Sequence, residues 1–569
     1  MGVRRRSKQG VGTVIGSTIF ILILLLGFSS LFIILSANND YNQTVAQMAQ
    51  FDIERQSESL NIDSASFIAN SYGLYRSNTG VNTLLASKAR IWSGSAWGPE
   101  KELPSSGSPV RWIRTAYSPI SSRDYEVIVA TLSDDGFIDV FVWTGTSWSA
   151  TYDIGNVGTT ANAYRPFDVA YEKTSGRALL VYGVLSSDTS RDMAYRIWDG
   201  VSWSGEQYIN IALGTETDLQ VNWLALATKP TSGSNTIGLI SLTSNSRAEA
   251  FIWDGSSWGN QHDLTTTASI VTEESIALGW ETSSGALLVV AGQDTAGNIR
   301  WNRFTTSWGT SSTLDIVAQS NPVNWLTLKS DPVSTSNYLM VASVDGAQDF
   351  VTVFWNGATW TATSHDTSVD THASRDGDFE WEPTGSRGLL AWATTSGPNT
   401  RIGWKTFTAP STYGTATFQN VGSNPHAWVR LSRNPLTTST IKLLGAFLES
   451  TANDLGAITW DGTSFTVVGA STFTADSSSS TFESFSLVFQ PSGASGIRAK
   501  FTNSGPQAIH VISTWAVNST AATRYDQDLW LAAGETNSIV MSYTWFQGQY
   551  SIRAITERGN VIVGASTVQ

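Results

Sequence analysis

The sequence predicts a mainly β protein with one long N-terminal helix, in which a β-propeller is followed by a C-terminal β-sandwich. Three observations predict this fold class. A sequence motif of two aromatic residues flanking a glycine turn recurs along most of the 569 residues. A stretch of 25 uncharged residues follows a basic N-terminus. The repeat of the motif stops near residue 491. We therefore expect a helix, a large repeat domain and a smaller β domain, in that order.

The clearest copy of the repeated motif is Trp253-Asp254-Gly255-Ser256-Ser257-Trp258. Asp-Gly and Asn-Gly pairs favour type I′ turns, whose central residues need positive φ, so each copy predicts a tight hairpin between two strands. Successive copies lie 51 to 55 residues apart. The first aromatic residues of the eight copies are Trp92, Trp143, Trp198, Trp253, Phe304, Trp355, Phe407 and Trp460.

Each hairpin from the second onward is preceded by a strand-like run, such as Gly285 to Gly292, and by an opening run that begins on an apolar residue. Three to four short strands in a period of about 50 residues are typical of a propeller blade. The turn chemistry and the β-branched residues exclude a helical solenoid, and a β-helix needs a shorter period. The opening residues are Trp112, Phe167, Trp223, Ile276, Trp325, Phe379, Trp428 and Phe485.

The ends of the repeat predict how the ring closes. The hairpin at Trp92 to Trp97 has no opening strand before it, and the opening strand Phe485 to Pro491 has no hairpin after it. Pairing these two fragments gives eight blades and removes two exposed edges. Seven blades is the alternative, in which Phe485 begins the sandwich. The propeller is assigned to residues 88–491.

The N-terminal segment predicts a membrane-spanning helix. Residues 1–10 are basic, and Val11 to Leu35 is long enough to cross a bilayer, with the basic side in the cytoplasm. A cleaved secretory signal is the alternative, although its apolar region is usually shorter. Apolar residues at Tyr41, Val45 and Phe51 extend the predicted helix over residues 11–60.

The junction between the basic and apolar parts resembles a known family. Lys8-Gln9-Gly10 followed by Val11 to Gly16 resembles the class III signal of archaeal type IV pilin-like and archaellin-like proteins, although Gln9 stands where that family often has Lys or Arg. The resemblance implies that a prepilin peptidase-like enzyme cuts between Gly10 and Val11. It also implies that the apolar helix remains on the mature protein and packs against other subunits.

Two further features of the sequence concern assembly and modification. Gly12 and Gly16 form a Gly-x-x-x-Gly pair that allows close helix approach in an apolar medium, although glycine is also common in membrane helices generally. Asn42 and Asn518 lie in Asn-x-Thr sequons, which makes them candidate glycosylation sites.

The remaining segments are a linker over residues 61–87, rich in Ser, Asn, Gly and Thr, and a C-terminal module over residues 492–569. The module alternates short strand-like runs with turns, which predicts a β-sandwich. Its turns at Phe501 to Gly505 and at Thr556 to Asn560 resemble those of small immunoglobulin-like modules in archaeal surface proteins.

Composition and motifs predict no catalytic residue, cofactor or metal site. The absence of cysteine excludes disulfides and thiolate chemistry, and a net charge of −13 argues against nucleic acid as a partner. The five histidines show no ligand spacing. Several carboxylates are expected to be ordinary turn residues. They are Asp134, Asp135, Glu273, Glu274, Asp376, Asp378 and Glu380.

These observations predict a non-enzymatic subunit of an extracellular pilus-like or archaellum-like filament. Its helix would reside in the membrane before assembly and self-associate in the filament core, with propeller and sandwich outside. The alternative is a singly anchored cell-surface adhesin or carbohydrate-binding propeller whose partners are surface glycans. An anchored glycoside hydrolase is a weaker alternative, because no acid–base pair is evident.

Overall fold

The structure divides the chain into two units that interleave along the sequence. One unit combines the chain up to Phe67 with everything from Ile497 onward, and the other comprises Ile68–Gly496. The second unit is therefore inserted into the first. The computed structural model describes residues 9–566 except for residues 69–71, 77–85, 93–96, 98–99, 121–122, 124–125, 145–147, 185–190, 212–219, 269–270, 317–318, 370–373, 399, 470–472, 474–479, 490–495, 518–521 and 543–549.

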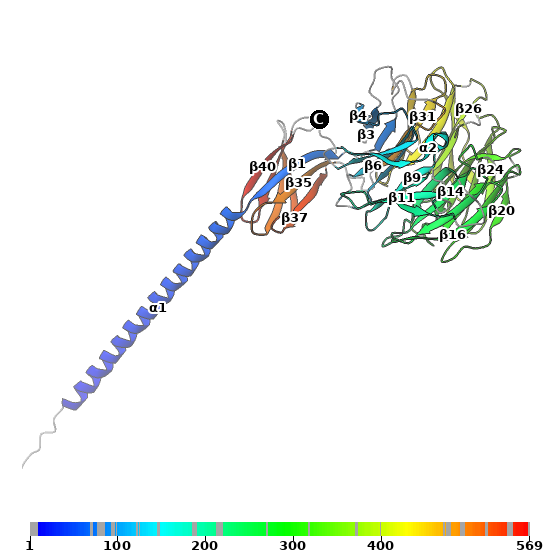
Figure 1. Ribbon diagram of the computed structural model, residues 1–569. Helices are drawn as coiled ribbons and strands as arrows, with labels where there is room; N and C mark the ends of the chain where they lie inside the picture. Colours follow the sequence, from blue (N-terminus) through cyan, green and yellow to red (C-terminus); the bar gives the residue numbers. More distant parts are fainter. Residues whose placement is uncertain are drawn as a thin grey trace, which may run out of the picture. The chain divides into compact units, whose positions relative to one another are not determined.

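The long helix α1 runs over Gln9–Ser57 (Figure 1). It contains no proline, so nothing interrupts its backbone hydrogen bonds, and its 49 residues extend for about 73 Å. It is long and apolar enough to cross a membrane, and its apolar side chains from Val14 to Phe51 are exposed in the single chain. It stops three residues short of the predicted end, because Leu60 begins a strand.

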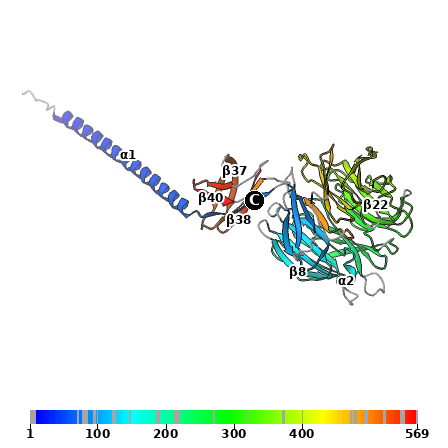
Figure 2. The same ribbon diagram turned by 90° about the horizontal axis from the view of Figure 1, so that it is seen from above.

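The helix leads into a sandwich of two sheets, with strand orders β1-β35-β38 and β37-β36-β39-β40. Leu60, Phe501, Val511 and Ile552 belong to the apolar core that these strands share. Figure 2 shows β37, β38 and β40 together at the end of α1. The strands are β1 (Leu60–Ile68), β35 (Gly496–Asn503), β36 (Ile509–Val517), β37 (Ala522–Leu531), β38 (Thr536–Ser542), β39 (Tyr550–Thr556) and β40 (Val561–Ser566).

Two turns of the sandwich hold the C-terminal end of α1. The carboxylate of Glu58, whose side chain is only 2% exposed, accepts hydrogen bonds from Arg558 (3.0 Å) and Asn560 (2.8 Å) in the turn after β39. In the turn after β35, the amide of Ser504 donates to the carbonyl of Ser59 (2.8 Å). These are the two turns on which the resemblance to immunoglobulin-like modules rests. They join helix and sandwich through a buried charged contact.

The inserted unit is a propeller, as predicted. Among the described residues, eight sheets follow one another round a ring, because the innermost strand of each contacts that of the next and the eighth contacts the first. Blade 1 contains β5 (Val110–Tyr117), β6 (Val127–Ser133), β7 (Phe137–Trp143) and β8 (Trp148–Asn156), and the short helix α2 (Gly158–Ala161) follows it. Blade 2 contains β9 (Phe167–Tyr171), β10 (Ala178–Gly183), β11 (Met193–Trp198) and β12 (Gln207–Ile209). Blade 3 contains β13 (Val221–Thr228), β14 (Ile237–Thr243), β15 (Ala248–Trp253) and β16 (Trp258–Thr265).

The other five blades have the same layout, and blade 6 carries an additional outer strand. Blade 4 contains β17 (Ile276–Trp280), β18 (Leu287–Gly292), β19 (Asn298–Phe304) and β20 (Ser312–Asp315), and blade 5 contains β21 (Val323–Ser330), β22 (Leu339–Asp345), β23 (Phe350–Trp355) and β24 (Trp360–Asp366). Blade 6 contains β25 (Gly377–Trp381), β26 (Arg387–Thr394), β27 (Arg401–Thr408), β28 (Thr412–Tyr413) and β29 (Thr417–Asn420). Blade 7 contains β30 (His426–Arg433), β31 (Leu443–Glu449), β32 (Leu455–Trp460) and β33 (Phe465–Val468), and blade 8 contains β34 (Phe485–Phe489), β2 (Tyr72–Arg76), β3 (Ala86–Trp92) and β4 (Lys101–Ser105).

Blade 8 closes the ring with strands from both ends of the inserted unit. Its innermost strand, β34, pairs with β2 in a register that sets Phe485 opposite Arg76 and Phe489 opposite Tyr72. The predicted closure by the Phe485 strand is thus correct, and the count is eight. The strand that receives it, β2, lies in the segment predicted to be a linker.

Residues 61–87 are therefore not a simple linker, because they contain most of β1, all of β2 and the start of β3. In β1 the apolar residues Leu60 and Ile62 pack on the sandwich core, but Asn61 separates them and Asp63 and Ser64 follow. This composition resembles a loop, although the alternation at Leu60 and Ile62 is a strand signal. The sandwich takes its remaining six strands from the predicted C-terminal module.

The repeated hairpins are tight but are not two-residue type I′ turns. Trp253 pairs directly with Trp258, which leaves a four-residue loop. Gly255 has φ +103, but Asp254 is not among the residues with positive φ. Instead, its carboxylate accepts hydrogen bonds from the amides of Ser256 and Ser257 (both 2.8 Å). The aspartate is needed as an acceptor within the loop, and the glycine supplies the left-handed turn.

Candidate functional site

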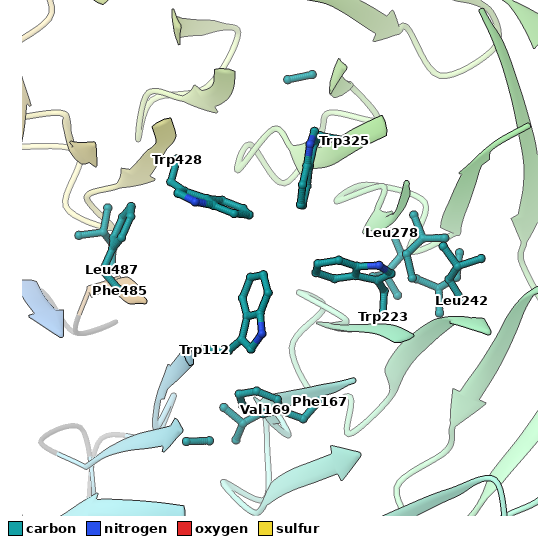
Figure 3. Packing of buried hydrophobic residues seen from close by; sticks show 14 of the residues in the cluster. Trp112, Phe167, Val169, Trp223, Leu242, Leu278, Trp325, Trp428, Phe485 and Leu487 are labelled. Atoms are coloured by element: carbon teal, nitrogen blue, oxygen red, sulfur yellow. The ribbon is translucent and has the colours of Figure 1, made fainter. Parts of the chain in front are cut away.

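Four tryptophans fill the axis of the propeller. Trp112, Trp223, Trp325 and Trp428 come from the innermost strands of blades 1, 3, 5 and 7, and Figure 3 shows their rings pointing toward one another. Successive ring centroids are 5.4, 5.5, 4.9 and 5.7 Å apart, with interplanar angles of 80 to 90°. Aromatic rings favour this edge-to-face arrangement. We call these four residues the tryptophan ring, and none is more than 3% exposed.

An irregular strand position places each member of the tryptophan ring. The pairing register shifts between Val110 and Trp112, and the same shift precedes Trp223 and Trp325 and surrounds Trp428. The innermost strands of blades 2, 4, 6 and 8 pair without such a shift. A β-bulge re-aims a side chain, so the odd blades turn their tryptophan toward the axis. The propeller is consequently built from four two-blade units.

A buried charged layer accompanies the tryptophan ring. Each even blade carries a charged residue two positions before its innermost strand, and the sign alternates round the ring. These residues are Arg165, Glu274, Arg375 and Glu483, and they are joined by Arg114 from blade 1 and Arg430 from blade 7. We call these six residues the axial charge layer.

Glu483 is the most highly connected member of the axial charge layer. Its carboxylate accepts hydrogen bonds from Arg114 (2.9 Å), Arg430 (2.8 Å) and Arg375. Because Glu483 lies two positions before β34, these bonds attach the closing strand to blades 1, 6 and 7. Glu274 pairs with Arg165 and lies 3.7 Å from Arg114.

Neighbouring guanidiniums keep Glu483 ionised. Burial alone would raise the pKa of Glu483, but the charges of Arg375, Arg430 and Arg114 lower it well below its usual range. Burial and the charge of Arg165 lower the pKa of Arg114 to about 10. Glu483 is therefore a permanent ion-pair partner near neutral pH and not a proton donor.

Glutamates at the turns of blades 2, 4 and 6 hold the repeated hairpins of blades 3, 5 and 7. Each lies directly after an innermost strand and accepts the indole N–H of a hairpin tryptophan at 2.6 to 2.9 Å. A buried indole N–H needs such an acceptor, so the repeated tryptophans link blades together. The pairs are Glu172 with Trp253, Glu281 with Trp355 and Glu382 with Trp460.

The outer part of blade 2 presents an aromatic and charged cluster to solvent. Tyr208 is 42% exposed on β12, and the guanidinium carbon of Arg191 lies 4.5 Å from its ring centre. The Glu206 carboxylate accepts hydrogen bonds from the hydroxyls of Tyr208 (2.6 Å) and Tyr182. The hydrogen bond to Glu206 raises the pKa of Tyr208. We call these four residues the Tyr208 cluster.

Blade 6 repeats part of this arrangement. Phe418 on β29 is 40% exposed, and the guanidinium carbon of Arg401 lies 4.8 Å from its ring centre. Trp392 contacts the same ring edge to face at 6.0 Å. Blade 6 offers an aromatic–arginine pair but no tyrosine hydroxyl at Phe418.

Comparisons with known proteins bear on the propeller only. No family model and no curated protein matches the chain. The lectin BP39L of Burkholderia pseudomallei is similar at 9% identity and a TM-score of 0.45, over 63% of this chain and 98% of that one. SapL1 lectin in complex with alpha methyl fucoside is similar at 12% identity and 0.35, over 63% and 95% of the two chains. Aleuria aurantia lectin, a six-bladed propeller, is similar at 11% identity and 0.30, over 55% and 96%. The similarity is one of architecture, and nothing about this chain's ligand follows from it.

The structure places most of the predicted site residues on α1. Gly10 and Val11 lie at its beginning, and processing between them stays a prediction. A methyl group added at Gly12 or Gly16 would have no atom within 4 Å, so both positions are open for contact with another helix. Asn42 is exposed on the same helix, whereas Asn518 lies outside the described residues.

Four of the seven carboxylates predicted to be ordinary turn residues are buried. Glu274, Asp376, Asp378 and Glu380 are at most 7% exposed. Asp378 accepts the backbone amide of Leu431 in the neighbouring blade (2.9 Å), and Glu274 belongs to the axial charge layer. The prediction is wrong for Asp378 and Glu380 because both lie within β25, and for Glu274 and Asp376 because the segments before β17 and β25 are buried.

Sequence reasoning did not identify the axial charge layer or the Tyr208 cluster. The alternation of Trp with Phe or Ile at the opening positions is visible in the sequence, and so is a charged residue shortly before each even opening. The Tyr208 cluster has no comparable signal, because Arg191, Tyr182 and Glu206 lie on different segments of one blade. Among the described residues, no group of three or more His, Asp or Glu side chains is arranged to hold a metal.

Proposed function

We propose that this protein displays a carbohydrate-binding propeller on the outside of a membrane. The Tyr208 cluster is the observation that carries the proposal, since it places an exposed aromatic ring beside a carboxylate and a guanidinium. Helix α1 supports the location, because it is apolar over a bilayer's thickness and follows a basic segment. The role is one of binding and requires no catalytic group.

The chemistry of the cluster suits a sugar. An aromatic face packs against the C–H face of a pyranose. A carboxylate accepts hydrogen bonds from the sugar hydroxyls, and a guanidinium donates hydrogen bonds to them. Glu206 holds the Tyr208 hydroxyl at 2.6 Å, so the ring is fixed before a ligand arrives. Because the tryptophan ring fills the axis, the proposal places the ligand on the outer part of blade 2, where Tyr208 is exposed.

Replacing Tyr208 with alanine should weaken glycan binding about tenfold, a loss of about 1.4 kcal/mol. The measurement is a glycan array on the full chain in detergent micelles, followed by calorimetric titration of the best glycan. Tyr208→Phe should retain part of the affinity because it keeps the ring. Val201→Ala is the matched control on the same blade, because Val201 is 85% exposed and outside the cluster. Equal affinities for Tyr208→Ala and Val201→Ala would reject the site.

A second candidate function is the pilin-like filament subunit, and one observation favours it. The helix and the sandwich form a single unit, joined at Glu58, and the propeller is inserted between β1 and β35. In a filament of this kind, packed copies of α1 would form the core. The sandwich joined to each helix, and the propeller inserted into that sandwich, would then lie outside the core. This candidate is compatible with glycan binding by the propeller.

Replacing both Gly12 and Gly16 with leucine tests the filament candidate. The span stays apolar, so membrane insertion should be retained, but the added side chains should prevent close helix approach and reduce fibre yield at least severalfold. Electron microscopy of surface fibres is the measurement, with Ile19→Leu and Ile23→Leu together as the matched control. Normal fibres from the Gly12→Leu, Gly16→Leu chain would show that this pair is not an interface.

A further inference from the structure

The outer face of the four-stranded sheet of the sandwich is apolar and exposed. Trp530 on β37, Ile512 on β36 and Val561 and Val563 on β40 are 36% to 60% exposed. Trp530 is the one tryptophan in the described part of the chain with this degree of exposure. The half-buried Ile555 lies beside Val561 in the strand register and continues the apolar surface across the sheet. We call this surface the outer face.

The outer face carries charges of both signs. Arg553 is exposed on β39 beside Val563, and it forms no ion pair with the residues that the structure describes. Asp528 and Glu557 have side chains that are 86% and 63% exposed, and both contact His510. Arg553 is thus an exposed cation without an ion pair among the described residues, and the carboxylates of Asp528 and Glu557 stay exposed although they contact His510. A second copy of the same face would offer groups of both signs to these charges.

The outer face begins where α1 ends. The turn that holds Glu58 connects β39 to β40, and its Glu557 lies 3.1 Å from His510. The ring of Trp530 stacks on His510 at 4.1 Å with an interplanar angle of 7°. Copies of the chain anchored by the same helix would therefore present this face at the same height above the membrane.

We infer that the outer face docks onto the outer face of a second copy of this chain. Three of its four exposed apolar side chains are aliphatic, and aliphatic side chains pack against protein better than they stack on sugars. Two copies inserted in one membrane are related by rotation about the membrane normal, which permits a self-complementary contact. This contact goes beyond glycan binding by the propeller and uses a different surface.

Cysteine cross-linking tests this inference directly, because the chain contains no cysteine. Val563→Cys and Ile512→Cys, separately and mixed, are prepared in the full chain in detergent micelles and oxidised with copper phenanthroline. Disulfide-linked dimers are expected, since the bond requires Cα atoms within about 7 Å. Lys500→Cys is the matched control, because Lys500 is exposed on β35 in the other sheet and should not cross-link.

Sedimentation in the same detergent provides the second readout. Val563→Asp should raise the dissociation constant of self-association at least tenfold, while Lys500→Asp leaves it unchanged and both variants keep glycan binding at Tyr208. Cross-linking that is equal at Val563 and Lys500, or absent at both face positions, would overturn the inference. A glycan whose binding is lost in Trp530→Ala would also overturn it and assign the face to a sugar.

Discussion

Replacing Glu483 with glutamine should destabilise the propeller by about 3–5 kcal/mol. The substitution removes the charge that Arg114, Arg375 and Arg430 share. It leaves two buried guanidiniums and the partly buried guanidinium of Arg430 without the Glu483 carboxylate. Because Glu483 precedes the closing strand, the loss also weakens the attachment of blade 8. Chemical denaturation of the full chain at neutral pH, followed by tryptophan fluorescence, is the measurement.

The pH dependence of this effect provides an internal check. The pKa of Glu483 is lower in the folded state, so its contribution is complete above the pKa of an unfolded glutamate, about 4.3, and is lost as the pH falls toward the folded value. The difference between wild type and Glu483→Gln should therefore shrink between about pH 4 and pH 2. Asp134→Asn, at the partly exposed pair with Arg111, is the control and should cost less than about 1 kcal/mol. Equal stability of wild type and Glu483→Gln at neutral pH would contradict the account.

Replacing Trp112 with alanine should cost about 3–5 kcal/mol. Trp112 is 2% exposed and contacts Trp223, Trp428 and Phe482, so its removal opens a cavity on the propeller axis. It also removes the indole N–H that bonds the carbonyl of Asn162 ahead of blade 2 (3.2 Å). Thermal unfolding of the full chain, read by near-ultraviolet circular dichroism, is the measurement.

Two further variants show whether the loss of stability comes from the contacts within the tryptophan ring or from the removal of any aromatic side chain of the propeller. Trp112→Phe retains part of the edge-to-face contacts and should cost less than Trp112→Ala. Tyr152→Ala removes a propeller side chain that is 51% exposed and should change stability by about 0.5 kcal/mol. If Trp112→Ala is no more destabilising than Tyr152→Ala, the ring does not stabilise the axis.

The sequence was sufficient for the features that repeat locally. The aromatic residues on either side of each glycine turn identify the hairpins, because both strands and their connection lie within a few residues. The unmatched fragments at Trp92 and Phe485 then gave the closure and the count of eight, since a ring leaves no free strand. The apolar run after Val11 predicted the helix for an equally local reason.

The features that sequence reasoning missed depend on contacts between distant residues. Pairing of β1 with β35 joins residues more than 400 positions apart. The sequence near Leu60 contains no pattern that identifies the strand with which β1 pairs. The prediction of a type I′ turn at Asp254 was wrong for a local reason. An Asp-Gly pair is compatible with a type I′ turn and also with a longer loop in which the aspartate side chain accepts backbone hydrogen bonds. The Tyr208 cluster gathers single residues from several strands, a pattern with no period to detect.

Insertion of the propeller into the sandwich sets an order on biosynthesis. β1 is made early, yet it cannot pair until β35 appears after the whole of Ile68–Gly496, a delay of roughly 20–90 s at ordinary rates of translation. The assembly of blade 8 is delayed for the same reason, because β2 is synthesised near the start of the inserted unit and β34 near its end. The propeller ring is therefore complete before the sandwich is. A truncated chain would have a membrane helix but neither a closed ring nor a finished sandwich, so it would expose the unpaired edges of β1 and β2 to proteolysis.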